Sequence, residues 1–130
     1  VASCAKREAE IAGLPAAEAA EFLAGYGLRE SGVARVAQAV YKLLGLISFF
    51  TAGEDECRAW TIARGTPAVE AAGAIHTDLS KHFIRAEVIG WQELLQFGSE
   101  AEDRGQGKLR LEGKDYIVQD GEVMHIRHSG

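Results

Sequence analysis

Cysteine and proline are scarce in this sequence, with two of each among 130 residues. Cys4 and Cys57 form neither a CxxC pair nor the dense pattern of a disulfide-stabilised secreted domain, so we expect a reduced, cytoplasmic protein. No apolar run approaches the ~20 residues that cross a bilayer, and no basic, apolar leader is present. We therefore expect no membrane partner.

A phosphate-binding P-loop is also missing, because the pattern G-x-x-x-x-G-K-[ST] occurs nowhere in the sequence. We accordingly expect this chain to bind no cofactor and to hydrolyse no nucleotide by itself. The sequence begins at Val1 rather than at methionine, and we interpret it as a cleaved, truncated or incompletely represented protein.

Positive charge is in deficit, and the deficit is confined to one part of the chain. The formal net charge is -5, and residues 1–44 contribute none of it, with five basic and five acidic side chains. An acidic second part is unsuited to wrapping free nucleic acid, which requires clustered lysine and arginine. A local basic face remains possible.

The first 45 residues favour helices. We expect one helix over residues 5–12, a second from Pro15 to Gly27, and a third that Ser31 caps and Gly45 ends. Phe22 and Tyr26 should share a side of the second helix. The third carries an apolar stripe that must pack on something, formed by Val33, Val36, Val40, Leu43 and Leu44.

Residues 46–130 alternate between strand and helix patterns. The patterns of residues 46–51 and 56–65 predict a hairpin whose first strand is buried from both sides. A helix should follow over residues 67–83, with Thr66 as its cap and a break near Gly73. A strand, a short helix over 92–97 and a polar loop over 98–107 follow. Residues 108–118 and 122–128 predict two further strands, joined by a hairpin turn at positions 120 and 121. This order predicts an α+β fold, the ubiquitin-like β-grasp.

Three polar residues between helix and strand patterns, His76, Asp78 and His82, form a candidate metal or acid–base site. On a helix, a separation of six residues leaves the two histidines about 120° apart, whereas zinc ligands on helices stand at i and i+4. We therefore favour a helix-end and surface role for them. Cys57 lacks local support as a nucleophile, and the acidic pairs lie in predicted turns.

Basic residues interleaved with aromatic ones form a second candidate site. Arg58, Trp60 and Arg64 share one face of a predicted strand, and Lys108, Arg110 and Lys114 precede Tyr116. Such a face could contact RNA phosphates and stack on bases. The alternative is that Trp60 and Ile62 belong to the core while the arginines reach its edge.

Several long words of this sequence closely resemble the C-terminal portion of the YchF family, the Obg-like P-loop ATPases and GTPases. The words occur in order and extend the resemblance over nearly the whole chain: CAKREAEIAGL, ESGVARVAQAVYKLLG, LLGLISFFTAGEDECRAWTIARGT, AAGAIHTDL, FIRAEVI and GKLRLEGKDYIVQDGEVM. The family usually has glycine where His82 stands, which makes His82 less suited to be a ligand.

The resemblance implies two domains. Residues 1–45 would be the helical C-terminal end of the nucleotide-binding (G) domain of a P-loop α/β fold, and residues 46–130 a TGS domain of β-grasp fold. Ser3, Cys4 and Ala5 would form the loop that approaches the nucleotide base through main-chain groups. ATP or GTP with Mg²⁺ is expected for the whole protein, whose P-loop would lie upstream of Val1.

The resemblance also implies partners. We expect the TGS domain to dock on the ribosome or RNA, and the helices to pack on the remainder of the nucleotide-binding domain. Arg58, Arg64, Lys108, Arg110 and Lys114 are the candidate RNA or ribosome contacts. A stand-alone ubiquitin-like protein-binding module is the alternative, and a metallohydrolase that uses the histidines ranks last.

Overall fold

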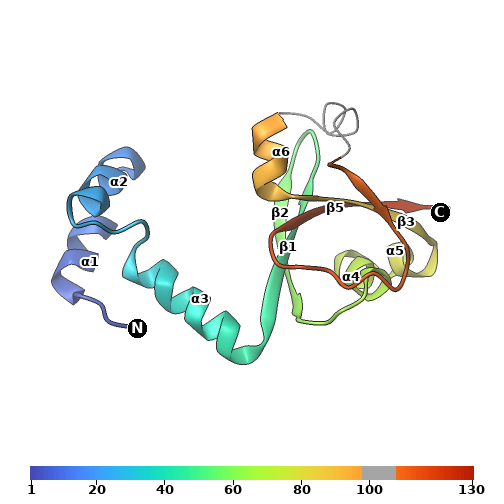
Figure 1. Cartoon of the computed structure of the whole chain (residues 1–130), viewed down its shortest axis with the longest axis horizontal. Helices are drawn as coiled ribbons and strands as arrows, with labels where there is room; N and C mark the ends of the chain where they lie inside the picture. The colour runs from blue at the N-terminus through green and yellow to red at the C-terminus, as the bar shows by residue number, and fades with distance from the viewer. Residues whose placement is uncertain (98–107) are drawn as a thin grey trace. The chain divides into compact units, whose positions relative to one another are not determined.

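The computed structural model describes residues 1–97 and 108–130. It divides into two compact units, Val1–Leu44 and Gly45–Gly130 (Figure 1). The polar loop expected at 98–107 lies outside the described residues. None of the helices in the two described ranges has the length and apolar character that a bilayer crossing requires.

The first unit consists of three helices, α1 (Ala5–Ala12), α2 (Ala16–Gly25) and α3 (Gly32–Leu44). The main-chain N–H of Ala34 donates to Ser31 Oγ at 3.2 Å, which confirms the predicted cap of α3. The rings of Phe22 and Tyr26 lie 5.1 Å apart, as their spacing predicts. The second helix stops two residues before Gly27, whose positive φ of 69° turns the chain toward α3.

The second unit is a β-grasp, as predicted: a mixed sheet on which helices pack. Its strand order is β2-β1-β5-β3-β4, with β1 and β5 parallel and the other neighbouring pairs antiparallel. The strands are β1 (Leu46–Ala52), β2 (Cys57–Ala63), β3 (Phe83–Gly90), β4 (Arg110–Glu112) and β5 (Glu122–His128). The expected hairpin of β1 and β2 is present, and the two edge strands are β2 and β4.

The predicted helix over 67–83 is two helices, α4 (Ala68–Ile75) and α5 (Thr77–Lys81). The break lies at His76, in extended backbone with a φ of -160°, and not at Gly73, which stays inside α4. Thr66 is not the cap, because its hydroxyl donates to the carbonyl of Ala63. Carbonyls of a distant segment accept from the first N–H groups of α4 instead: Ala68 donates to Tyr116 and Val69 donates to Lys114.

The core lies between the sheet and α4. Phe49 and Ala68 are fully buried and Ile47 is 2% exposed, while the remaining side chains of β1 are half-buried. The prediction that β1 is buried from both sides therefore holds fully for only one of its faces. Ile62 is buried and Trp60 packs against the same cluster, so the aromatic residue of β2 serves the core.

The predicted strand over 108–118 shortens to Arg110–Glu112, since residues 113–119 cross the start of α4. The predicted hairpin between the last two strands is also wrong, because β4 pairs with β3 and β5 lies on the other side of β3. Gly121 does have a positive φ, 82°, and its N–H donates to the carbonyl of Ser48. The short helix α6 (Trp91–Phe97) begins there, with Trp91 N–H bonded to the Gly121 carbonyl.

Candidate functional site

Two regions carry the residues that the sequence singles out, one in each unit. In the first unit, Ser3, Cys4 and Ala5 form the segment that enters α1, here called the base loop (residues 3–5). Ala5 is the first residue of α1, and the carbonyl of Cys4 accepts the N–H of Glu8 at 3.0 Å. All three residues are exposed, and Cys4 is a free thiol. The base loop therefore presents main-chain groups at the start of a helix.

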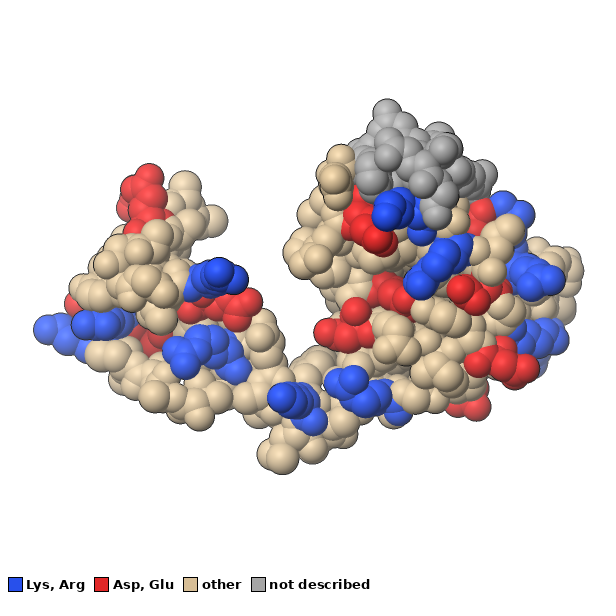
Figure 2. All heavy atoms as spheres, viewed as in Figure 1, with Lys and Arg blue, Asp and Glu red and all other residues tan. Residues whose placement is uncertain are grey.

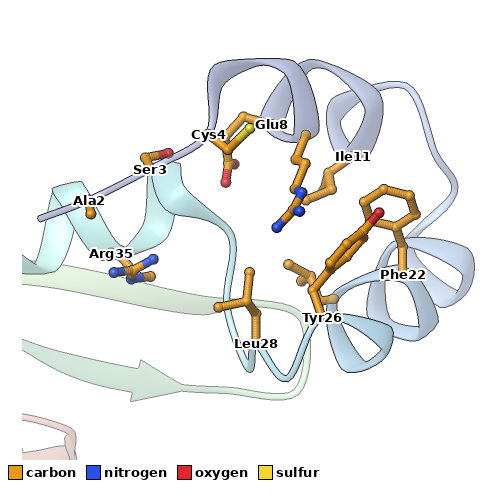
Figure 3. Close-up of a pocket in the computed structure, with 11 residues that line it drawn as sticks. Ala2, Ser3, Cys4, Glu8, Ile11, Phe22, Tyr26, Leu28 and Arg35 are labelled. Carbon is orange, nitrogen blue, oxygen red and sulfur yellow. The ribbon is translucent and has the colours of Figure 1, made fainter.

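A pocket of about 280 Å³ adjoins the base loop. Figure 3 shows Ser3 and Cys4 on one side of it and the rings of Phe22 and Tyr26 on the other. The guanidinium of Arg7 stacks over the Tyr26 ring, with its Cζ 3.9 Å from the ring centroid. Aromatic rings beside a guanidinium make a surface suited to planar groups.

Helix α1, which the base loop enters, is hydrogen-bonded to the start of α3. Glu8 Oε1 accepts a hydrogen bond of 2.8 Å from the main-chain N–H of Gly32, the first residue of α3. Gly32 itself is buried. The carboxylate thus stands at a helix N-terminus, where the helix dipole favours negative charge.

The five basic residues proposed as contacts lie in two separate groups. Arg58 is on edge strand β2 and Arg64 follows it, whereas Lys108, Arg110 and Lys114 lie in or beside edge strand β4. Four strand spacings of about 4.8 Å separate the two edges, or about 19 Å in all. The structure therefore does not bring the five residues together.

On the β2 edge, the Arg58 guanidinium stacks on Trp60, with its Cζ 4.3 Å from the ring centroid. The indole N–H of Trp60 donates to Thr51 Oγ1 at 2.9 Å, which fixes the ring against β1. Arg58 is exposed above that ring. The Arg58 cation is therefore exposed to solvent and is held by the ring of Trp60, which packs against the core.

On the β4 edge, Arg110 forms an ion pair with the buried carboxylate of Glu122, which the sequence did not reveal. Glu122 accepts hydrogen bonds from Arg110 Nη2 at 2.7 Å, from Tyr116 Oη at 2.5 Å and from the N–H of Gln119 at 2.9 Å. The side chain of Glu122 is 7% exposed, against 49% for Arg110. We call Arg110, Tyr116 and Glu122 the carboxylate clamp.

The clamp shifts the protonation of two of its members. Burial, followed by the hydrogen bond that the phenol donates to Glu122, raises the pKa of Tyr116 to about 12, because the ionised phenol would be desolvated and could not donate. Burial works against the charge of Arg110, but the hydrogen bond and the negative charge of Glu122 outweigh it, so the pKa of Arg110 is raised. Both groups keep their protons at neutral pH, and the clamp is a fixed structural unit.

A second buried acid, Glu87 on β3, pairs with Arg127 on β5. Glu87 is 3% exposed and faces the side of the sheet opposite to its neighbours Ala86 and Val88. The signal for it was present in the sequence, because a glutamate interrupts the apolar strand pattern. A buried glutamate requires a partner, and the sequence alone does not say which.

The histidine cluster has a structural role, as favoured above. The Nδ1 of His76 accepts the N–H of Asp78 at 3.1 Å and so caps α5. His82 ends that helix, with Nδ1 3.1 Å from the Asp78 carbonyl oxygen. Among the described residues, no group of three or more His, Cys, Asp or Glu side chains is arranged to hold a metal ion.

The apolar stripe of α3 is largely open to solvent. Leu43 is 86% exposed, Val33 72% and Leu44 64%. Such a row of large apolar side chains along one helix is typical of a surface that packs on another element.

Comparison with known proteins decides the family. The sequence profile of YchF-GTPase_C, described as a protein of unknown function (DUF933), matches residues 46–129. This chain belongs to the YchF family. The YchF resemblance seen in the sequence is thereby confirmed.

Curated YchF relatives extend the match into the helical unit. The chain is 55% identical over 124 residues to a ribosome-binding ATPase YchF of Haemophilus ducreyi, covering 95% of this chain and 34% of that protein. A ribosome-binding ATPase YchF of Bacillus subtilis is 51% identical, again over 95% of this chain and 34% of that protein. Obg-like ATPase 1 of Caenorhabditis elegans is 45% identical over 92% of this chain and 30% of that protein. The chain thus spans about a third of the length of these relatives.

A solved structure gives the same result for the fold. The YchF GTPase of Schizosaccharomyces pombe superposes with a TM-score of 0.75 at 36% sequence identity, over 91% of this chain and 31% of that one. A GTP-binding protein from Pyrococcus horikoshii superposes with a TM-score of 0.51 at 22% identity, over 78% of this chain and 26% of that one, which supports the fold alone.

Proposed function

We propose that this chain is the C-terminal part of a YchF-type ATPase or GTPase of the cytoplasm. Residues 46–130 form its docking module for the ribosome or RNA. Residues outside this chain bind the phosphates and Mg²⁺ of ATP or GTP and hydrolyse the nucleotide. The observation that carries this proposal is the identity of 55% over 95% of the chain to a protein named a ribosome-binding ATPase.

The first unit contributes to the nucleotide site in this proposal. The base loop offers main-chain groups of Ser3, Cys4 and Ala5 at the start of α1, where N–H donors suit the acceptors of a purine edge. In P-loop ATPases and GTPases the P-loop binds the phosphates, and this sequence contains no such loop. The base loop therefore acts together with the remainder of the nucleotide-binding domain.

The second unit supplies the docking surface. Figure 2 shows acidic and basic side chains interspersed over its visible face, so docking depends on a few local cations rather than on a broad positive field. Arg58 and Arg64 at the β2 edge are better suited than Arg110, whose charge Glu122 neutralises. The exposed stripe of α3 argues against the alternative of a stand-alone ubiquitin-like module, because such a stripe requires cover.

Co-sedimentation of the full-length protein with ribosomes, with nucleotide and at graded salt, tests the proposal. We expect binding at low salt that weakens steadily as salt rises, since counterion release accompanies each phosphate contact. The double variant R58A/R64A should lower the salt dependence, while R29A, an exposed arginine of the first unit, should leave it unchanged. Absence of co-sedimentation even at low salt would overturn the docking role.

A further inference from the structure

Two side chains from the start of the sequence meet at one residue, Gly32. The carboxylate of Glu8 accepts the Gly32 N–H at 2.8 Å. The hydroxyl of Ser3, in the base loop, lies beside Gly32, at the place where a side chain at that position would begin. Ser3 of the base loop and Glu8 of α1 therefore both contact the first residue of α3, and the Glu8 hydrogen bond joins residues 24 positions apart.

The contact requires glycine at position 32. A Cβ on Gly32 would lie 2.6 Å from Glu8 Oε1 and 2.8 Å from Glu8 Cδ, and it would overlap Ser3 Oγ. Any other residue would displace the side-chain ends of Ser3 and Glu8 from the start of α3. Backbone conformation does not explain the glycine, because the positive-φ glycines are Gly27, Gly45, Gly65 and Gly121 in the described residues.

The hydrogen bond also has an electrostatic reason. Gly32 is the first residue of α3, and Ser31 Oγ already accepts the N–H of Ala34. The Glu8 carboxylate satisfies another of the N–H groups that a helix start leaves open, in a half-buried place where the helix dipole favours an anion. Glu8 therefore joins α1, which the base loop enters, to the helix that leads into the sheet.

We propose that Glu8 and Gly32 are positioning residues for nucleotide recognition, which hold the base loop against α3 so that its main-chain groups meet the purine. This inference rests on the proposed function. Neither side chain touches the nucleotide in this account. Both act through Ser3 and the main chain of the base loop.

The test measures how strongly full-length variants bind ATP and inorganic tripolyphosphate, a probe that has no base. We expect G32A and E8A to weaken ATP binding about tenfold or more, as loss of a hydrogen bond to a charged group would. Tripolyphosphate affinity should stay within about twofold of the wild-type value, because the base loop does not contact phosphate.

E8Q keeps an oxygen that can accept the Gly32 N–H, so it should restore most of the ATP affinity. Glu10→Ala, an exposed carboxylate on the same helix, is the matched control and should behave as the wild type.

Equal losses for ATP and tripolyphosphate would overturn the inference, because they would indicate a general structural fault. Unchanged ATP binding in E8A would also overturn it. Should G32A fail to fold, as judged by circular dichroism, the E8A and E8Q pair decides alone. A wild-type protein that binds neither ATP nor GTP would instead refute the proposed function, so the two failures are distinguishable.

Discussion

Replacement of Glu122 by alanine tests the carboxylate clamp most severely. The substitution removes the common acceptor of three hydrogen bonds, from Arg110, Tyr116 and the main chain of Gln119. Arg110 is about half exposed and regains water, whereas Gln119 N–H and Tyr116 Oη lose the acceptor of partly buried hydrogen bonds. We expect a loss of about 3 kcal/mol in the free energy of unfolding, because three hydrogen bonds to one charged acceptor are lost together.

A loss of that size is large against the total of about 5–15 kcal/mol that stabilises a typical domain. For a unit of this size, it corresponds to a fall in Tm of about 12–24 °C. Urea unfolding of the 130-residue chain, followed by circular dichroism and tryptophan fluorescence, measures it. E122Q keeps an acceptor and the shape of the side chain, so it should lose about 1 kcal/mol.

Glu54→Ala, in the exposed turn between β1 and β2, is the control and should change the free energy of unfolding by no more than about 0.5 kcal/mol. The reasoning is refuted if E122A unfolds at the same urea concentration as the wild type. It is equally refuted if the control loses as much as E122A.

Three further predictions concern the second unit. The pKa of Tyr116 is raised from its ordinary value of 10 to about 12 in the folded protein, so Tyr116 ionises in the unfolded chain first as the pH rises. Its contribution to the free energy of unfolding is therefore complete below pH 10 and is lost toward pH 12. The urea midpoint of Y116F should lack that decline. Gly121→Ala should lower the free energy of unfolding by about 1–3 kcal/mol, because φ is 82° and the new Cβ would lie 2.8 Å from Trp91 Cδ1. An unchanged thermal midpoint would contradict this prediction. His76→Ala should lower the free energy of unfolding by about 1 kcal/mol, because it removes the cap of α5. The amide hydrogen of Asp78 should then exchange faster than in the wild type.

Local patterns in the sequence predicted the elements that depend on neighbouring residues. The hairpin of β1 and β2, the Ser31 cap of α3 and the pairing of Phe22 with Tyr26 each rest on residues no more than 17 positions apart, the separation of Leu46 and Ala63. Short-range chemistry is enough to specify such features.

The features that were missed depend on contacts between distant segments. Gly121 has the positive φ that a hairpin turn would need. A loop beside β1 uses the same backbone conformation, so the glycine alone does not say which of the two forms. The start of α4 is satisfied by carbonyls of residues 114 and 116, which no local motif at Thr66 reveals. The acceptor role of Glu122 toward Arg110 likewise arises from the arrangement of the sheet and the loop. Partner choice in such contacts is a property of the fold.

Removal of residues 45–130 from the full-length protein, followed by ribosome co-sedimentation at low salt, tests the central claim most directly. We expect the shortened protein to stay in the supernatant, while the intact protein pellets with the ribosomes. Pelleting of the shortened protein to the same extent as the intact one would contradict the assignment of docking to the β-grasp unit.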